Sequence, residues 1–376
     1  MIGGGGSANR VDLPEIARLR LRNQRLAGEK FKTAEQAIGW LGAVQSQEYA
    51  LAKWSLGERT SGLTDSAVDD LLREGTILRT HILRPTWHFV LPADVRWMMA
   101  LTGPRIAAKN QPPGLSTIDE SFVRRGLDVI GDALTGGRRL TRAQISNLLV
   151  EKGIAASANE TIPIFMRAEL DLVIASGGLE GKLQTYALVD ERAPKLDNFD
   201  RDWALAELTR RYFTSHGPAT VPDFTWWSSL TAADTRRGIE INGSALERLD
   251  VGGTWHWWAG ETVDDFTRDD PSPVVHLLQG YDEYIVAYRS PRSPINLNAL
   301  VGATALSRPP YLHAVVLDTQ VVGWWRRLMQ KDRAVIETRL LIDLDRRQRA
   351  ALRAAVDRYS RFLELPVEFA GPQAEN

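Results

Sequence analysis

The hydrophobic and polar positions of the chain form an arrangement that occurs three times. Each copy begins with a helical pattern, and a short link leads to a second helix that opens on a Thr with Gln or Asp three residues later, a capping box. These threonines are Thr33, Thr141 and Thr220. Alternating residues typical of short strands close the copies, at 75–92, 177–191 and 246–258. Because two or three helices and a small hairpin make a winged helix, the pattern predicts three winged-helix motifs in tandem.

The pattern changes after about Val274, where β-rich segments precede a basic amphipathic helix over residues 345–365. We therefore predict an α+β fold in which a C-terminal β-rich module follows the winged helices. The turn at Asp318 and Thr319 lacks the glycine that two-residue hairpins prefer, so we expect a looser loop there.

The three copies share the positions of their helix starts but few identical residues. The alternative to a true repeat is therefore a coincidence of helix starts. The predicted division is a flexible leader over 1–9, winged helices over 10–110, 116–192 and 198–262, and the C-terminal module over 270–370.

Composition narrows the class of protein. At 376 residues the chain is too long for one hydrophobic core. Its 44% hydrophobic and 25% charged residues are those of an ordinary soluble globular protein, and no apolar run reaches the roughly 18 residues of a membrane span. Cysteine is absent, which excludes disulfides, thiolate nucleophiles and cysteine-ligated metals. We therefore expect a cytoplasmic protein with no membrane segment.

Charge gives a local signal only. The formal net charge of -1 provides no overall attraction to nucleic acid, so such an interaction must rest on patches. One patch lies in residues 10–32, where seven Lys and Arg stand against three acidic residues. The alternative interpretation is a solvated helix face.

Cofactor signals are lacking in the sequence. The six histidines are scattered, without a carboxylate at ligand spacing. The glycine-rich start has no preceding strand and no Gly-Lys pair, so it is not a phosphate loop. We expect neither a metal nor another cofactor.

The stretch VQSQEYA, residues 44–50, places Gln45 and Gln47 one residue apart after a helical stripe. Two such side chains point about 200° apart on a helix but to the same side of an extended segment. If both serve one site, this stretch must leave the helix, although no glycine cap marks the end. The alternative is that the pair caps the helix or faces solvent.

Five segments together resemble a known family. They are the glutamine pair, RTHILRPTWHFV, HGPATVPDFTWWSSL, YDEYIVAYR and VVGWWRR. They resemble the winged-helix DNA-binding family that contains the AlkZ-like and YcaQ-like DNA glycosylases, over about residues 11–366. The resemblance implies a concave scaffold that embraces duplex DNA and an active site marked by Gln-x-Gln or Gln-x-Asp. Ser46 departs from the usually apolar middle position of that motif.

The resemblance also implies an activity. Members excise N7-alkylated purines, and some unhook interstrand crosslinks. We therefore expect a monofunctional DNA glycosylase that hydrolyses the N-glycosidic bond of N7-alkylated or bulky, crosslinked purines in duplex DNA, for alkylation repair or self-resistance to a genotoxin. Gln45 and Gln47 would be catalytic and hold the attacking water. The alternatives are a non-catalytic winged-helix DNA-binding protein, such as a transcriptional regulator, and a protein-interaction scaffold.

Other polar residues are candidates for the pocket. In a single extended strand over 79–90, Arg84, Thr86 and His88 share one face, which would line the pocket or contact a phosphate; His88 is alternatively structural. Pro85 indicates that this strand lies at a sheet edge or breaks at that point. The YDEY segment offers Asp282, Glu283 and Tyr284, although Asp282 is alternatively the structural partner of an arginine. Glu48 would point away from Gln47 in an extended segment.

The expected partner is double-stranded DNA that carries alkylated purines, bound by a monomer in the nucleoid region of the cytoplasm. The predicted DNA contacts are Arg18, Arg20, Arg22, Arg25, Arg326 and Arg327. The hairpin over 313–325 is the candidate for an element that approaches the minor groove. The twelve tryptophans include pairs that suggest stacking platforms for bases, although most are expected in the core.

Overall fold

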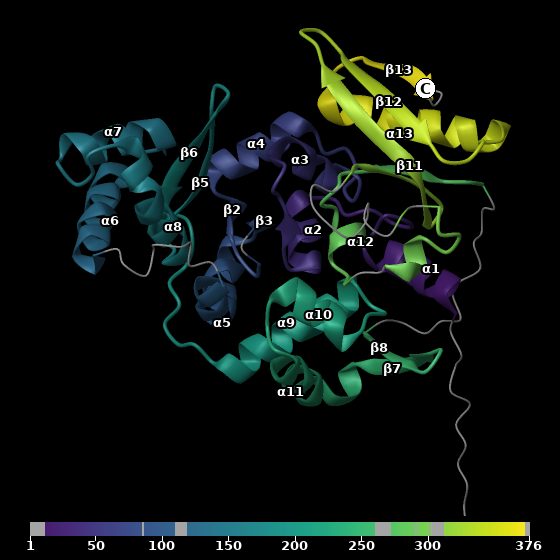
Figure 1. The fold of residues 1–376 in the computed structure, drawn as a ribbon, viewed down its shortest axis with the longest axis horizontal. Helices are drawn as coiled ribbons and strands as arrows, with labels where there is room; N and C mark the ends of the chain where they lie inside the picture. Colours follow the sequence, from purple (N-terminus) through teal and green to yellow (C-terminus); the bar gives the residue numbers. More distant parts are fainter. Residues whose placement is uncertain are drawn as a thin grey trace, which may run out of the picture.

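The computed structural model describes residues 12–84, 86–109, 119–259, 272–289, 292–300, 302 and 312–372. The predicted leader over 1–9 lies outside these ranges. The described elements form a mixed α+β protein in which three helix-rich units, each with a small antiparallel sheet, join a C-terminal module (Figure 1). No helix in the described ranges is long and apolar enough to cross a membrane.

The first unit covers residues 12–109, and its sheet has the strand order β1-β3-β2. Its elements are α1 (Leu13–Asn23), α2 (Ala34–Leu41), β1 (Val44–Gln45), α3 (Tyr49–Gly57), α4 (Asp65–Glu74), β2 (Leu78–His81), β3 (Trp87–Val90) and α5 (Pro92–Lys109).

The second unit covers 119–191, with the strand order β4-β6-β5, and the third covers 200–259, with a two-stranded sheet. The second unit contains α6 (Glu120–Leu134), β4 (Leu140–Thr141), α7 (Arg142–Glu151), α8 (Ile162–Leu170), β5 (Ile174–Glu180) and β6 (Leu183–Leu188). The third contains α9 (Arg201–Ser215), α10 (Val221–Ser228), α11 (Ala232–Asn242), β7 (Glu247–Val251) and β8 (Thr254–Trp258).

The C-terminal module, residues 272–372, is a five-stranded sheet of order β13-β12-β11-β10-β9, in which β12 and β13 run parallel. One long helix, α13, packs on it through Leu352, Val356 and Tyr359. The elements are β9 (Val275–Leu278), α12 (Glu283–Val286), β10 (Ala314–Leu317), β11 (Gln320–Met329), β12 (Ala334–Leu340), α13 (Arg346–Leu363) and β13 (Val367–Pro372).

The predicted helix starts at the three threonines are confirmed. Thr141 and Thr220 form complete capping boxes, in which the Thr side chain and the side chain three residues later each accept a main-chain N–H of the other. Thr33 accepts the N–H of Gln36, but the Gln36 side chain accepts from Lys32, one residue before the cap. Caps are local devices, which is why the sequence alone reveals them.

The predictions of a loose loop at Asp318 and of a helix end without glycine are wrong. Leu317 pairs with Gln320, so the hairpin has a tight two-residue turn, in which Asp318 adopts a φ of 57°. Asp tolerates this left-handed conformation, and glycine is therefore not required. A glycine does end α2, since Gly42 follows the helix with a φ of 82°.

The stretch 79–90 is not one extended strand. It forms the hairpin of β2 and β3, and the connecting residues include Leu83 with a φ of 62°. The β-rich pattern after Val274 is also interrupted, because the YDEY segment opens the short helix α12 and does not continue β9.

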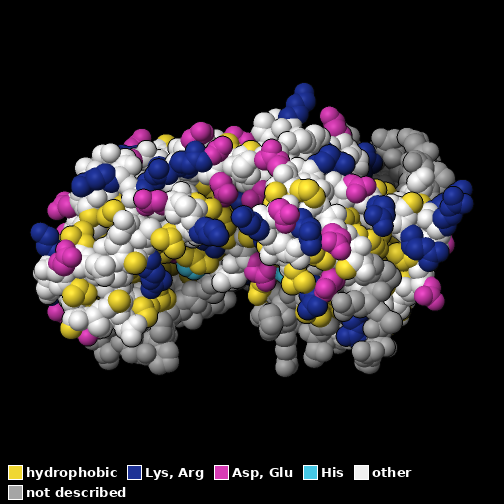
Figure 2. All heavy atoms as spheres, turned by 90° about the horizontal axis from the view of Figure 1, so that it is seen from above, with side chains coloured by type: hydrophobic (Ala, Val, Ile, Leu, Met, Phe, Trp, Pro, Cys, Tyr) yellow, Lys and Arg dark blue, Asp and Glu magenta, His cyan; other side chains and the backbone are white. Residues whose placement is uncertain are grey.

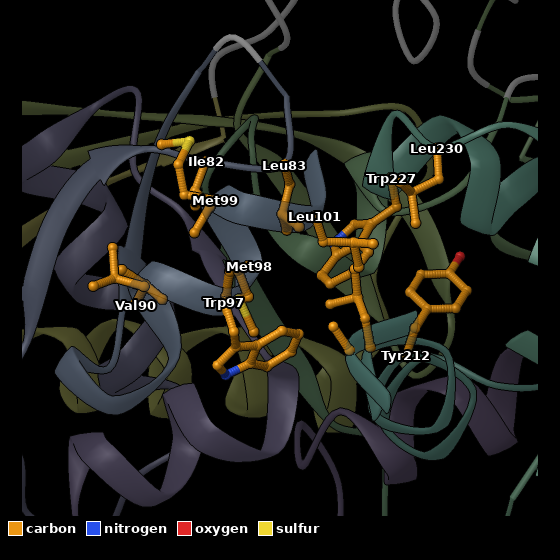
Figure 3. Packing of buried hydrophobic residues seen from close by; sticks show 14 of the residues in the cluster. Ile82, Leu83, Val90, Trp97, Met98, Met99, Leu101, Tyr212, Trp227 and Leu230 are labelled. Carbon is orange, nitrogen blue, oxygen red and sulfur yellow. The ribbon is translucent and has the colours of Figure 1, made fainter. Parts of the chain in front are cut away.

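A buried hydrophobic cluster joins the first unit to the third (Figure 3). Leu83 and Met98 of the first unit belong to the same cluster as Tyr212 of α9 and Trp227 of α10. The rings of Tyr212 and Trp227 lie 5.1 Å apart, and both side chains are buried. Burial of a large apolar side chain contributes about 1.5–3 kcal/mol, so this shared core holds the two units in one fixed relation.

Candidate active site

The glutamine pair lies on an edge strand of the first unit. β1 pairs antiparallel with β3, which places Gln45 opposite His88. Ser46 continues the ladder by donating its N–H to the carbonyl of Trp87 at 2.7 Å. Gln47 lies in the bend that follows. The prediction that the pair leaves the helix is therefore confirmed.

The two glutamines differ in burial. Gln45 is 3% exposed, whereas Gln47 is exposed to solvent. Gln45 Oε1 accepts the main-chain N–H of Gln47, and Gln47 Oε1 accepts the N–H of Trp87, both at 3.5 Å. Gln47 is therefore open to solvent, while the buried Gln45 contacts its main chain.

Side chains from the C-terminal module hold both main-chain groups of Gln45. The Gln45 N–H donates to Glu283 Oε1 at 2.9 Å. Its carbonyl accepts from Gln279 Nε2 at 3.3 Å, and the same amide donates to Ser55 Oγ at 2.9 Å. We call Gln279 and Glu283 the clamp. In the described part of the sheet, no strand pairs with the outer edge of β1. The clamp side chains bind the main-chain groups of that edge in place of a strand.

Glu283 places a buried negative charge next to this strand. Its side chain is fully buried, and Oε2 accepts the Trp227 indole N–H at 3.0 Å and lies 3.4 Å from His216 Nε2. Burial raises the pKa of Glu283, but His216 and the Arg84 guanidinium outweigh it and lower the pKa to about 2. Glu283 is therefore a carboxylate at neutral pH.

His88 is a neutral member of the site. It pairs across the sheet with both Gln45 and Thr80, so these three side chains form a row on one face. Its Nδ1 lies 2.8 Å from the carbonyl of Thr86, which assigns the proton to Nδ1. Burial, with a contribution from the Arg84 guanidinium, lowers the pKa of His88 to about 3.

Arg84, Thr86 and His88 therefore lie together, but not on one strand as predicted. Arg84 belongs to the loop between β2 and β3, where it donates to the Val286 carbonyl of α12 at 3.2 Å. Thr86 precedes β3, and His88 lies within it. The hairpin, not strand alternation, brings them near the glutamine motif.

Only Glu283 of the YDEY candidates contacts the motif through a hydrogen bond that the structure describes. Asp282 is buried and forms a bidentate ion pair with Arg59, at 2.7 and 2.8 Å, so it is the structural partner of an arginine. Tyr284 is also buried, and its hydroxyl donates to the Thr319 carbonyl at 3.1 Å. Tyr284 therefore belongs to the core of the C-terminal module and not to the pocket.

Glu48 lies at the rim of the site. It is the residue before α3, and its carboxylate is 3.4 Å from His313 Nε2. Burial raises the pKa of Glu48, whereas the nearby Arg327 guanidinium lowers it. β11, which carries Arg327, therefore runs close to the residue that follows the glutamine motif.

The predicted DNA contacts separate into two groups. Arg20 is 3% exposed, donates to the Pro218 carbonyl at 2.8 Å and stacks on the Tyr288 ring, so its assignment as a DNA contact is wrong. Arg25 is partly buried against Trp40. By contrast, Arg18 is exposed, and the Arg326 side chain is 63% exposed.

Arg22 and Arg327 are partly buried. Arg327 Nη1 donates to the Tyr359 hydroxyl at 2.6 Å. The face seen from above has two lobes, and basic and acidic side chains are interspersed over both (Figure 2). Positive charge is thus local, as the net charge of -1 requires.

Sequence patterns alone give no role to Gln279, His216 and Trp227. His216 and Trp227 lie in the HGPATVPDFTWWSSL segment that carries the resemblance, and Gln279 precedes YDEY by two residues. Their contacts join positions separated by up to 234 residues, which no local periodicity can indicate. Within the described ranges, no cluster of three or more His, Asp and Glu side chains has the arrangement of a metal site.

The arrangement of units around the glutamine motif is the fold of a DNA glycosylase of known structure. The Streptomyces sahachiroi DNA glycosylase AlkZ matches 96% of this chain and 100% of its own, with a TM-score of 0.75 and 20% sequence identity. The family model described as DNA glycosylase AlkZ-like matches residues 38–362, and the chain therefore belongs to the AlkZ-like DNA glycosylase family.

A relative from Streptomyces sahachiroi is named interstrand DNA cross-link repair glycosylase. It is 23% identical over 348 residues, which cover 83% of this chain and 87% of the relative. The family resemblance inferred from the sequence segments is thereby confirmed.

Proposed function

We propose that this protein is a monofunctional DNA glycosylase that hydrolyses the N-glycosidic bond of N7-alkylated or bulky, crosslinked purines in duplex DNA. The observation that carries the proposal is the exposed Gln47, which extends from a strand whose preceding residue, Gln45, is held on both main-chain groups by the clamp. A site held in this way is pre-organised, which is what positional catalysis requires.

The chemistry suits a cationic leaving group. An N7-alkylguanine already carries positive charge, so the bond between C1′ and N9 can break with its electron pair passing to the base, which leaves neutral. The oxygen of a water molecule then bonds to C1′, and its proton passes to solvent, so that an abasic site and a free base result. No general acid is needed, and an amide suffices to orient the water.

The electrostatics of the site fit this course. The sugar develops positive charge as the bond breaks, and preorganised negative groups near that charge lower the barrier. The Gln47 amide oxygen is the exposed acceptor, and the buried Glu283 carboxylate lies one hydrogen bond behind Gln45. We propose that Gln47 holds the water, that Gln45 fixes Gln47, and that Glu283 contributes its charge at longer range.

For DNA binding we propose that the three units act as winged helices along the duplex, with Arg18 and Arg326 among the phosphate contacts. The hairpin that approaches the groove is better assigned to β11 and β12 than to β10 and β11. In the turn between β10 and β11, the Asp318 main-chain N–H donates to the Val274 carbonyl at 2.7 Å, so this turn is held against the C-terminal module. The opposite end of β11 carries Met329, which is 50% exposed, at a hairpin that Figure 1 shows projecting from the C-terminal module.

The test is release of 7-methylguanine from a methylated duplex under single-turnover conditions. We expect Gln47→Ala to lose at least 90% of the rate, since removing one preorganised group commonly costs 10²–10³ in catalysis. Its folding should be unchanged because Gln47 is exposed. Gln36→Ala, a change of an exposed glutamine on the preceding helix, is the matched control and should retain activity.

Two results would count against the proposal. Wild-type protein that binds damaged duplex but releases no base from methylated or crosslinked substrates would indicate a non-catalytic DNA-binding protein. Selection of a palindromic binding sequence would point to a regulator.

A further inference from the structure

Two adjacent tryptophans on α10 have opposite environments. Trp227 is fully buried and packs against Tyr212 and Phe224 in the core shared by the first and third units (Figure 3). Trp226, the preceding residue, is 41% exposed. A large aromatic side chain left this exposed beside a functional site is a feature that the fold does not require.

A hydrogen bond from the edge of the indole fixes the position of the exposed Trp226 ring. Its Nε1 donates to the Val286 carbonyl at 3.0 Å, and Arg84 Nη1 donates to the same carbonyl at 3.2 Å. Because the hydrogen bond uses the edge of the indole, it leaves the face of the ring free to stack.

Trp226 is also close to the glutamine motif. Val286 is the last residue of α12, and Glu283, which binds the N–H of Gln45, is the first. A helix rises 1.5 Å per residue, so the backbones of Glu283 and Val286 lie about 5 Å apart along the axis of α12. One short helix therefore connects the exposed indole to the strand that carries the proposed catalytic residues.

We propose that Trp226 is the stacking platform for the alkylated purine or for the planar substituent that it carries, and so is a specificity-determining residue. This inference rests on the proposed glycosylase function. An N7-alkylpurine combines a flat π-system with positive charge, and an indole face attracts both, through stacking and through its quadrupole. A planar, polycyclic substituent offers more area to the ring than a methyl group does, so the contribution of Trp226 should grow with the size of the adduct.

The experiment compares two duplex substrates, one with 7-methylguanine and one with a guanine N7 adduct that carries a fused aromatic ring system. Single-turnover rates are measured as a function of protein concentration for wild type, Trp226→Ala and Trp226→Phe. We expect Trp226→Ala to lower the rate on the aromatic adduct, at limiting protein, about tenfold, in line with measured base–aromatic stacking. The loss on 7-methylguanine should be smaller than the loss on the aromatic adduct, because a methyl group adds almost no planar area to the stack.

Trp226→Phe separates stacking from positioning, because it keeps a ring but loses the N–H that binds Val286. It should recover most of the rate on the aromatic adduct. Trp203→Ala is the matched control, since Trp203 is 52% exposed on α9 and has no contact with α12 that the structure describes. It should leave both rates unchanged.

The proposal is overturned if Trp226→Ala slows both substrates equally, or if Trp226→Phe is as slow as Trp226→Ala on the aromatic adduct. Either result would show that the residue acts through its hydrogen bond. If wild type releases neither base, the glycosylase function fails, and quenching of tryptophan fluorescence by the aromatic-adduct duplex decides about stacking. A quench that is smaller in Trp226→Phe than in wild type supports the platform, and an equal quench refutes it.

Discussion

Replacement of Glu283 by Gln tests whether the buried carboxylate holds the glutamine motif. Oε1 and Oε2 of Glu283 each accept one N–H, from Gln45 at 2.9 Å and from Trp227 at 3.0 Å. An amide in the same place has one acceptor oxygen, so its NH₂ group must face one of the two N–H donors. A buried donor left without an acceptor costs about 1–3 kcal/mol.

The lowered pKa of Glu283 gives a second measure of the same effect. Its pKa is about 2 in the folded protein, against an ordinary value of 4.5. A group whose pKa is lower in the folded state contributes stability above its unfolded pKa, here about 3 kcal/mol, and this stability is lost as the pH falls from 4.5 toward 2. The two measures agree in order, so we expect Glu283→Gln to lower the free energy of unfolding at pH 7 by about 3 kcal/mol.

The assay is urea unfolding at a series of pH values, together with release of 7-methylguanine at a temperature where the variant remains folded. The difference in unfolding free energy between wild type and Glu283→Gln should narrow below pH 4.5. Base release per folded molecule should fall about tenfold or more, because the substitution removes the buried negative charge next to Gln45 and leaves only one acceptor for the N–H groups of Gln45 and Trp227. Glu240→Gln, at a side chain 72% exposed on α11, is the control and should change neither quantity.

The reasoning is refuted if Glu283→Gln unfolds at the same urea concentration as wild type, or if the difference in stability does not change with pH. A variant that is destabilised as expected but releases base at the wild-type rate would show that the clamp serves folding alone.

Three further predictions follow from buried and exposed charges. Asp282→Asn should lower the free energy of unfolding in urea by about 3–5 kcal/mol, because it leaves the buried Arg59 guanidinium without its carboxylate. Arg326→Ala should weaken binding of undamaged duplex and reduce the slope of log K against log salt concentration by about 1, since one phosphate contact is lost. Arg20→Ala should leave that slope unchanged and instead lower the melting temperature, because Arg20 is buried against Tyr288.

Two local features of the sequence predicted local structure correctly. The threonine caps marked three helix starts, and the spacing of Gln45 and Gln47 indicated an extended segment if both serve one site, because both signals depend only on neighbouring residues. The contacts that hold the candidate site together are not local. Gln279 and Glu283 contact Gln45 from more than 230 positions away in the sequence. No local pattern of residues indicates that these positions are close in the fold.

The burial of Arg20, by contrast, has a visible sequence signal. Arg20 lies four residues after Ile16 and therefore shares a helix face with it, and Ile16 is fully buried in the core. The basic composition of residues 10–32 suggested a DNA-binding face, but helical periodicity separates the exposed Arg18 from the buried Arg20. The number of basic residues in a segment therefore does not show which of them face solvent and could contact DNA.

The clamp also bears on how the chain folds as it leaves the ribosome. N-terminal parts of a protein generally fold first during synthesis, and β1 belongs to the first unit. Until residues 279–283 emerge, the free N–H and C=O of Gln45 form an unprotected strand edge of the kind that recruits foreign strands. The last module to be synthesised therefore both covers an aggregation-prone edge and completes the proposed catalytic strand, and we expect a truncated chain to release no base and to aggregate.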